Sequence, residues 1–374
     1  MTDPKQILNT ALKRASANIS NPIIKNRQIH GRINSVCRNK MNRACVRLLL
    51  AALLAKIHKP HVDIRKPYTE IGSPDSYSGR TYDERYIIDL IREHDLPCNP
   101  TTAFLTPAFR NRNMTLTPDL DLEGRPKDLY KKTLQLLTDV HENKLSVEDA
   151  LAETVRCLLI LRNERKQQLE MLLSGLETSQ ERIPLSSENI VTLVEQHLNC
   201  PRSSRLPVLV VAAAYKAAEN YLGERVLPLT SHTAADEQTG ALGDLEITLI
   251  DDDNVVTGYE MKTRRVTPAD IDRALQKLGN SGKKIDNYIF ITTGLIEKDV
   301  QDYAKALYEK TGGIEFVILD CINFLRHFLH LFHRLRIQFL DEYQKLILGE
   351  PESAVRQELK QAFLALRQAA ETGE

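Results

Sequence analysis

Short apolar stretches alternate with helical patterns through the second half of the chain, and this alternation limits the folds open to it. Hydrophobic periodicity predicts helices over 206–222, 267–278 and 295–310, and strands over 242–250, 255–264, 288–292 and 314–319. Thr267 is expected to be the N-cap of the helix over 267–278, with Asp270 reaching back to it. Continuous apolar strands that alternate with helices are typical of parallel strands covered on both faces. We therefore expect an α/β (α+β) fold here, with a central mixed sheet flanked by helices and one or two amphipathic helices from Asn323 onward.

The first half of the sequence has a different, mostly helical pattern. Apolar residues recur at helical spacing over 45–56, 82–93 and 146–176, whereas 96–121 is rich in Pro, Asn, Thr and Arg and predicts a long ordered loop. A chain of 374 residues exceeds the usual size of one domain. We place a linker at 178–187 and expect two domains, a mostly helical, basic region over 1–180 and a second domain over 181–374.

Composition narrows the class of protein. No apolar run approaches the ~20 residues that span a bilayer, and the N-terminus lacks the apolar stretch of a secretory signal. The six cysteines are scattered without a CxxC pair, which is typical of reduced thiols and argues against a zinc ribbon or a disulfide scaffold. We expect a cytoplasmic chain that is not embedded in a membrane.

Charge is unevenly distributed although the net charge is zero. Residues 1–60 contain twelve Lys and Arg and one acid, which gives +11, so the other 314 residues carry −11. This distribution is expected where one part of a protein binds phosphate and another holds metal-binding carboxylates. A solvated basic face on an ordinary helical domain is the alternative.

The best candidates for phosphate contacts are the cations at the start of the helix predicted over 45–56, whose N-terminal amides also favour an anion. They are Arg38, Lys40, Arg43 and Arg47. Two further segments are dense in side chains that pair bidentately with guanine or adenine. They contain Arg80 and Arg85 in one and Arg110, Asn111, Arg112 and Asn113 in the other. The same residue types cap helices and bind backbone carbonyls within loops, so both interpretations stay open.

Charged residues interrupt two of the predicted strands. Asp244 and Glu246 lie on the first strand, and Glu260 and Lys262 on the second. Residues two apart in a strand share a face, so Glu260 and Lys262 project together while Met261 points into the core. Mg²⁺ takes one or two carboxylates together with waters and phosphate oxygens. A lysine beside such a metal can hold the attacking water or offset the charge of the transition state.

The turn between these strands decides whether the acids meet. A two- or four-residue turn within 251–254 places Asp244 opposite Met261 and puts the acids on opposite faces. A three-residue loop at 252–254 shifts the pairing by one, so that Asp244 lies opposite Lys262 and Glu246 opposite Glu260. The functional interpretation therefore requires the three-residue loop.

This arrangement resembles the PD-(D/E)XK nuclease superfamily. In that pattern an acid begins one strand, Glu-x-Lys lies on the adjacent antiparallel strand, and a helix and a parallel strand follow. Asp244 matches the leading acid, with Gly243 in place of the proline, and the stretch from Glu260 to Lys262 matches the E-x-K. The resemblance implies that Asp244 and Glu260 bind the metal and that Lys262 is the catalytic lysine. Glu219, late in the preceding helix, lies where many members place an extra acid, and Glu246 is a further candidate ligand.

A basic helical first half followed by a nuclease core resembles a type II restriction endonuclease and is similar to the SacI family. The resemblance implies a Mg²⁺-dependent enzyme, with Mn²⁺ as a substitute, that cuts double-stranded DNA as a homodimer on a palindromic site. It further implies a prokaryotic cytoplasm and a cognate DNA methyltransferase. Two alternatives stay open: a repair or recombination nuclease of the same superfamily, and a catalytically silent DNA-binding protein in which Glu260 and Lys262 form a structural ion pair.

Overall fold

The chain is a mixed α and β protein with two compact units, Met1–Gln167 and Gln168–Glu374. The computed structural model describes residues 3–39, 43–98, 102–106, 108–109, 113–177, 184–229, 241–252 and 254–372. The units divide within helix α7 (Val147–Glu177), whereas the sequence placed the boundary at residue 180. One helix therefore belongs to both units, because its apolar residues near 150–159 pack into the first core and those near 169–176 into the second.

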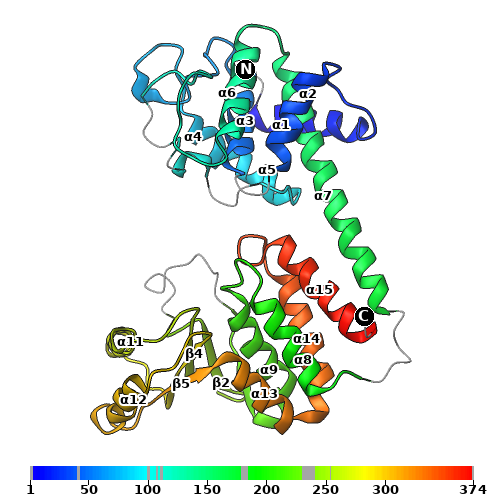
Figure 1. Cartoon of the computed structure of the whole chain (residues 1–374). Coiled ribbons are helices and arrows are strands. Elements are labelled where there is room, and N and C mark those ends of the chain that lie inside the picture. The colour runs from blue at the N-terminus through cyan, green and yellow to red at the C-terminus, as the bar shows by residue number, and fades with distance from the viewer. Residues whose placement is uncertain are drawn as a thin grey trace. The chain divides into compact units, whose positions relative to one another are not determined.

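In its described residues the first unit is built of helices alone, as the sequence predicts (Figure 1). Besides the start of α7 it contains α1 (Pro4–Ala17), α2 (Arg27–Arg38), α3 (Ala44–His58), α4 (Gly79–Tyr82), α5 (Ile88–Glu93) and α6 (Lys127–His141). A π-helical turn, Asp83–Ile87, joins α4 to α5, so the helix expected over 82–93 is continuous but not uniform. Every residue of α3 from Ala44 to Ala55 is buried, which makes α3 the centre of this core.

The long loop expected over 96–121 packs into the first unit where the structure describes it. Ala103–Leu105 forms a short 3-10 turn, and the side chains of Phe104, Phe109 and Leu116 are buried. The hydroxyl of Tyr68 donates a hydrogen bond to the carbonyl oxygen of Phe109. The described part of this loop is therefore a structural component of the core.

The second unit contains a five-stranded sheet in the order β1-β2-β3-β4-β5. The strands are β1 (Glu224–Val226), β2 (Leu245–Leu249), β3 (Val255–Lys262), β4 (Asn287–Thr292) and β5 (Glu315–Asp320). The helices are α8 (Ser187–Leu198), α9 (Leu206–Leu222), α11 (Pro268–Ser281), α12 (Lys298–Lys310), α13 (Cys321–Leu331), α14 (Arg336–Gly349) and α15 (Gln357–Thr372). β1 to β3 pair antiparallel, and β3 to β5 pair parallel, which is the expected mixed sheet. The short strand β1 was not predicted from the sequence. Three helices follow β5, whereas one or two were expected.

The sheet separates two apolar cores of the second unit. Ile247, Tyr259 and Ile291 point into a core shared with α8, α9, α13, α14 and α15. Tyr288 and Phe290 point the other way, into a smaller core shared with α11 and α12. Figure 1 shows α11 and α12 on one side of the sheet and α9 and α13 on the other. Side chains that alternate along β2 and β3 therefore face two different helical layers.

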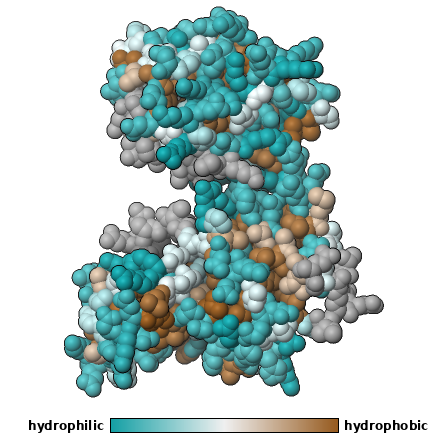
Figure 2. Space-filling model, viewed as in Figure 1, coloured by the Kyte–Doolittle hydropathy of each residue, from teal (hydrophilic) through white to brown (hydrophobic). Residues whose placement is uncertain are grey.

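The surfaces of the two units differ in polarity. Among the described residues, Met114 is the one exposed large hydrophobic side chain of the first unit. The others belong to the second unit, and Leu295, at 78%, and Tyr221, at 71%, are the most exposed. Figure 2 shows apolar residues gathered on the visible face of the second unit, whereas that of the first is mainly hydrophilic. None of the described helices is long and apolar enough to cross a bilayer, and all six cysteines are free.

Candidate active site

Four charged residues, three within β2 and β3 and one directly before β2, lie on the face of the sheet that α11 and α12 cover. Leu245, Ile247, Tyr259 and Met261 belong to the opposite face, where the first three are buried and Met261 packs against the same core. The residues that alternate with them along the chain are Asp244, Glu246, Glu260 and Lys262, of which Asp244 directly precedes β2. Strand alternation therefore gathers these four side chains on one side, and the expectation that Glu260 and Lys262 project together, away from Met261, is confirmed.

The register of the hairpin differs from the one that the sequence analysis required. β2 and β3 pair Leu245 with Tyr259 and Glu246 with Gly258, which places Asp244 opposite Glu260 when continued by one residue. The expected pairing of Asp244 with Lys262 is therefore wrong, and so is that of Glu246 with Glu260. The register shifts between Ile247 and Thr248, where a β-bulge brings the acids to one face. Residue 253, part of the proposed three-residue loop, lies outside the described residues.

Glu260 is held by three side chains. The Nζ atom of Lys262 lies 2.5 Å from Glu260 Oε1, and the hydroxyl of Tyr288 donates to Glu260 Oε2 at 2.5 Å. Lys277 of α11 places its Nζ 3.7 Å from the same Oε2. The side chain of Glu260 is 14% exposed and that of Lys262 19%, so solvent screens this group only in part. Two cations and a hydroxyl donor thus contact this largely buried carboxylate.

Asp244 contacts the strand that carries Glu260. Its Oδ2 accepts a hydrogen bond of 2.7 Å from the backbone N–H of Met261. The preceding Gly243 lies so close to β3 that an added Cβ atom would be 2.3 Å from the carbonyl oxygen of Tyr259. A proline, which has a Cβ atom, cannot stand there without a shift of the backbone. This contact gives a physical reason for the departure from the proline of the family pattern.

The two additional candidate ligands, Glu246 and Glu219, lie in different places relative to the sheet. Glu246 lies on the same face as Glu260, and its Oε1 accepts from the N–H of Leu242 at 2.9 Å and lies 3.4 Å from Lys283 Nζ. Glu219 lies on α9, which packs on the opposite face of the sheet. Among the contacts of the described residues, none joins Glu219 to Asp244 or Glu260. The structure does not bring Glu219 into the group.

Asp270 is a member of the group that the sequence analysis assigned only to the cap of a helix. That cap is confirmed, because Thr267 and Asp270 form a capping box at the start of α11. The buried carboxylate of Asp270 also binds Arg264 at 2.8 and 2.9 Å and lies 3.6 Å from Lys262 Nζ. Burial alone would raise its pKa, but the hydrogen bonds from Arg264 and Thr267 and the charge of Lys262 outweigh burial and hold the pKa of Asp270 well below its usual range.

A spacing in the sequence could have revealed this part of the site. Asp270, Arg273 and Lys277 are three and four residues apart, so they share one face of α11. Arg273 also binds Asp270. A helix that follows the E-x-K strand and repeats charged residues on one face indicates that this face meets the charged side of the sheet.

The donor set fits Mg²⁺ as two carboxylates rather than three. Continued by one residue, the register places Asp244, directly before β2, opposite Glu260 of β3, and Mg²⁺ needs only one or two carboxylates besides waters and phosphate oxygens. Of the described residues, only His30, Glu153 and Cys157 bring three ligand atoms within 4.8 Å of one another. Asp244, Glu246 and Glu260 therefore do not converge as a set of three.

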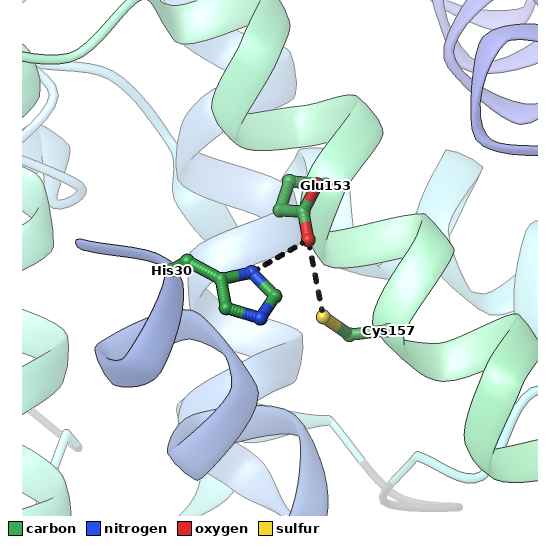
Figure 3. A group of neighbouring side chains, drawn as sticks. All are labelled: His30, Glu153 and Cys157. Atoms are coloured by element: carbon green, nitrogen blue, oxygen red, sulfur yellow. Dashed lines mark hydrogen bonds and ion pairs between the residues drawn. The ribbon is translucent and has the colours of Figure 1, made fainter. Parts of the chain in front are cut away.

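The group in the first unit has a different character (Figure 3). Glu153 Oε1 lies 2.9 Å from His30 Nδ1 and accepts from Cys157 Sγ at 3.6 Å. The same carboxylate binds Arg156 through Nε and Nη2 and accepts from the N–H of Ile23 at 2.7 Å. Nitrogen and sulfur ligands suit zinc rather than Mg²⁺, but an arginine already neutralises this buried glutamate. We interpret the group as a polar link between α2, α7 and the segment before α2.

The structure revises the phosphate contacts expected from the first 60 residues. Arg47 is buried, and its Nε donates to Asp83 Oδ1 at 2.6 Å, so its assignment to DNA is wrong. Arg38 ends α2 and binds both carboxylate oxygens of Glu164 at 2.6 Å. Arg43 is half-buried and directly precedes α3, while Lys40 lies outside the described residues.

The candidates for base contacts remain predictions. Arg80 and Arg85 are exposed, and Arg80 pairs with Glu84 at 2.7 Å. Asn113 is also exposed. The other three members of its segment, Arg110, Asn111 and Arg112, lie outside the described residues.

Comparison of the chain with models of known protein families finds no match, and comparison with curated proteins finds none either.

Proposed function

We propose that this protein is a Mg²⁺-dependent, site-specific endonuclease of double-stranded DNA with a PD-(D/E)XK core. The observation that carries the proposal is the convergence of Asp244, Glu260 and Lys262 on one face of adjacent strands, with the ammonium of Lys262 2.5 Å from Glu260. The strand order supports it, because the acid and the E-x-K lie on an antiparallel pair that continues into parallel strands.

Each residue has a role in this proposal. Asp244 and Glu260 would hold Mg²⁺, which when bound neutralises charge on the phosphate and lowers the pKa of a coordinated water. Lys262 holds a positive charge where negative charge develops on the transferring phosphate, and it can hydrogen-bond the attacking water. The hydroxyl of Tyr288, which lies 2.5 Å from Glu260 Oε2, helps to orient that carboxylate.

The basic first unit is proposed to hold the DNA, and a homodimer acting on a palindromic site is proposed to cut both strands. The unit carries 28 Lys and Arg against 19 Asp and Glu over residues 1–167, a net charge of +9. A charge of this sign attracts DNA by its phosphates. A cognate DNA methyltransferase would protect the host genome.

A plasmid-cleavage assay tests the proposal. The full chain is incubated with supercoiled plasmid in Mg²⁺ or in EDTA, beside Glu260→Gln and a control, Glu315→Gln, an exposed glutamate of the same sheet. Discrete fragments that need Mg²⁺ and Glu260 but not Glu315 support the proposal. Cutting without site preference would favour a repair or recombination nuclease, and binding without cutting would favour a silent DNA-binding protein.

A further inference from the structure

More cations contact Asp270 than are needed to neutralise one carboxylate. Its side chain is fully buried, yet it binds the guanidinium groups of Arg264 and Arg273 and lies 3.6 Å from the ammonium of Lys262. Lys262 is paired more closely with Glu260, at 2.5 Å, so these three cations and the two carboxylates together leave a net charge of +1. A single cation suffices to neutralise a capping carboxylate, so helix capping does not explain the other two.

The two arginines are held in place but remain open to solvent. The side chain of Arg264 is 54% exposed and that of Arg273 is 59% exposed. Arg264 uses Nη1 and Nη2 to bind Asp270 and the carbonyl oxygen of Arg265, which leaves part of its five N–H donors for another acceptor. A buried carboxylate therefore orients two guanidinium groups whose outer edges face water.

This cluster adjoins the candidate active site directly. Asp270 Oδ1 is shared by Lys262 and Arg264, and Lys262 in turn contacts Glu260. The arginines are consequently neighbours of the proposed catalytic lysine. Planar guanidinium groups bind phosphate oxygens bidentately, and oriented pairs lose little side-chain entropy on binding.

We propose that Arg264 and Arg273, oriented by the buried Asp270, form a clamp for one backbone phosphate of the nucleic acid next to the phosphate that is cut. The inference rests on the proposed nuclease function and adds a binding subsite to it. Asp270 is a positioning residue, because it acts through the two arginines. The clamp reads no bases, so it binds cognate and random DNA alike.

The salt dependence of DNA binding tests the clamp. Binding of the full chain to a fluorescein-labelled random duplex is measured in EDTA at several KCl concentrations. Arg273→Gln is the main variant, because Arg264 and Lys262 still neutralise Asp270 and preserve the fold. The control is Arg265→Gln, which removes an equally exposed arginine of the same segment that pairs with Glu297 instead.

We expect Arg273→Gln to weaken binding and to lower the slope of log K against log salt by up to about 0.9, the value for one phosphate contact, because Arg264 keeps part of that contact. Arg265→Gln is expected to leave the slope unchanged, and the urea midpoint of both variants is expected to match the wild type. Equal slopes for the wild type and Arg273→Gln would overturn the clamp.

A second measurement separates this inference from the proposed function. The plasmid assay is repeated with Arg273→Gln at limiting and at saturating DNA. The clamp predicts a raised KM, with cleavage restored at saturating DNA. If the wild type cuts, Glu260→Gln does not, and Arg273→Gln cuts with an unchanged KM, the clamp is wrong while the nuclease proposal stands. A wild type that binds DNA but does not cut leaves the slope test valid and overturns the nuclease proposal.

Discussion

The two units of this protein use their positive charges in opposite ways. In the first unit five cations of residues 1–60 bind acids of the same unit; these pairs are Lys5–Asp89, Arg14–Asp149, Arg32–Asp139, Arg38–Glu164 and Arg47–Asp83. In the second unit, four cations contact the two acids Glu260 and Asp270. These cations are Lys262, Arg264, Arg273 and Lys277. A run of like charges in a sequence therefore does not locate a binding surface, because folding can pair each charge with a distant partner.

The largest effect is expected at the site in the second unit. Lys262→Ala should lower plasmid cleavage by orders of magnitude, because it removes the charge proposed to stabilise the transition state. DNA binding should persist, since phosphate contacts lie elsewhere. The control is Lys284→Ala, an exposed lysine of the loop that follows α11. Equal cleavage by wild type and Lys262→Ala would remove the proposed difference between the units.

Breaking the buried ion pair of the first unit should affect stability instead. Arg47→Met leaves the carboxylate of Asp83 buried without its cation, at a cost of about 3–5 kcal/mol in the free energy of unfolding. Urea unfolding followed by tyrosine fluorescence measures the loss. Arg80→Met, which breaks an exposed pair, should change stability by about 0.5 kcal/mol. A loss for Arg47→Met as small as that for Arg80→Met would contradict a structural role.

Acid should weaken the second unit through the buried side chain of His197. His197 is buried and accepts from Tyr343 when its Nε2–H donates to the carbonyl of Leu359. Burial lowers the pKa of His197 to about 4, so its neutral form stabilises the fold fully above pH ~6.5, and that contribution is lost as the pH falls through 4. The loss is about 3 kcal/mol at pH 4.

The pair of Arg38 and Glu164 in the first unit responds to acid in a lower pH range than His197. The hydrogen bond from Arg38 holds the pKa of Glu164 below its usual 4.5, so the stabilisation from this pair is present above pH 4.5 and is lost only as the pH falls further. Urea unfolding of the wild type and of His197→Gln between pH 7 and 4 checks the order. The variant should lose less stability over this range, and an identical pH dependence would contradict the assignment.

The smallest effect is expected for Arg38. Its exposed pair with Glu164 is worth about 0.2–1 kcal/mol, so Arg38→Ala should barely change stability. We also expect an unchanged salt slope for DNA binding. A slope lowered by about 0.9 would show that Arg38 leaves Glu164 and binds a phosphate. The first unit would then also use a cation to bind DNA, as is proposed for the second.

The fold was predictable from sequence where periodicity decides it. The strands around Tyr259 and Phe290 and the helix of α3 follow from apolar spacing, and the cap of α11 follows from Thr267 and Asp270. β1 was missed because a strand of three half-buried residues has too short a pattern. The burial of Arg47 depends on Asp83, which is far away in sequence.

The sequence predicts which residues form most of the candidate site, but not how they are arranged in space. Strand alternation alone places Glu260 beside Lys262. The position of Asp244 depends on a β-bulge at Ile247 and Thr248, which no local pattern indicates. Asp270 could be found only as a cap, since its contact with Lys262 requires knowledge of how α11 packs on the sheet.

Binding of Mn²⁺ tests most directly the claim that the divalent metal site lies in the second unit. Mn²⁺ is titrated into the full chain without DNA, and bound and free ion are separated by electron paramagnetic resonance. The double variant Asp244→Asn with Glu260→Gln is compared with His30→Asn, which alters the other ligand group. We expect the double variant to lose Mn²⁺ binding and His30→Asn to retain it. Binding that survives in the double variant and is lost in His30→Asn would contradict the account.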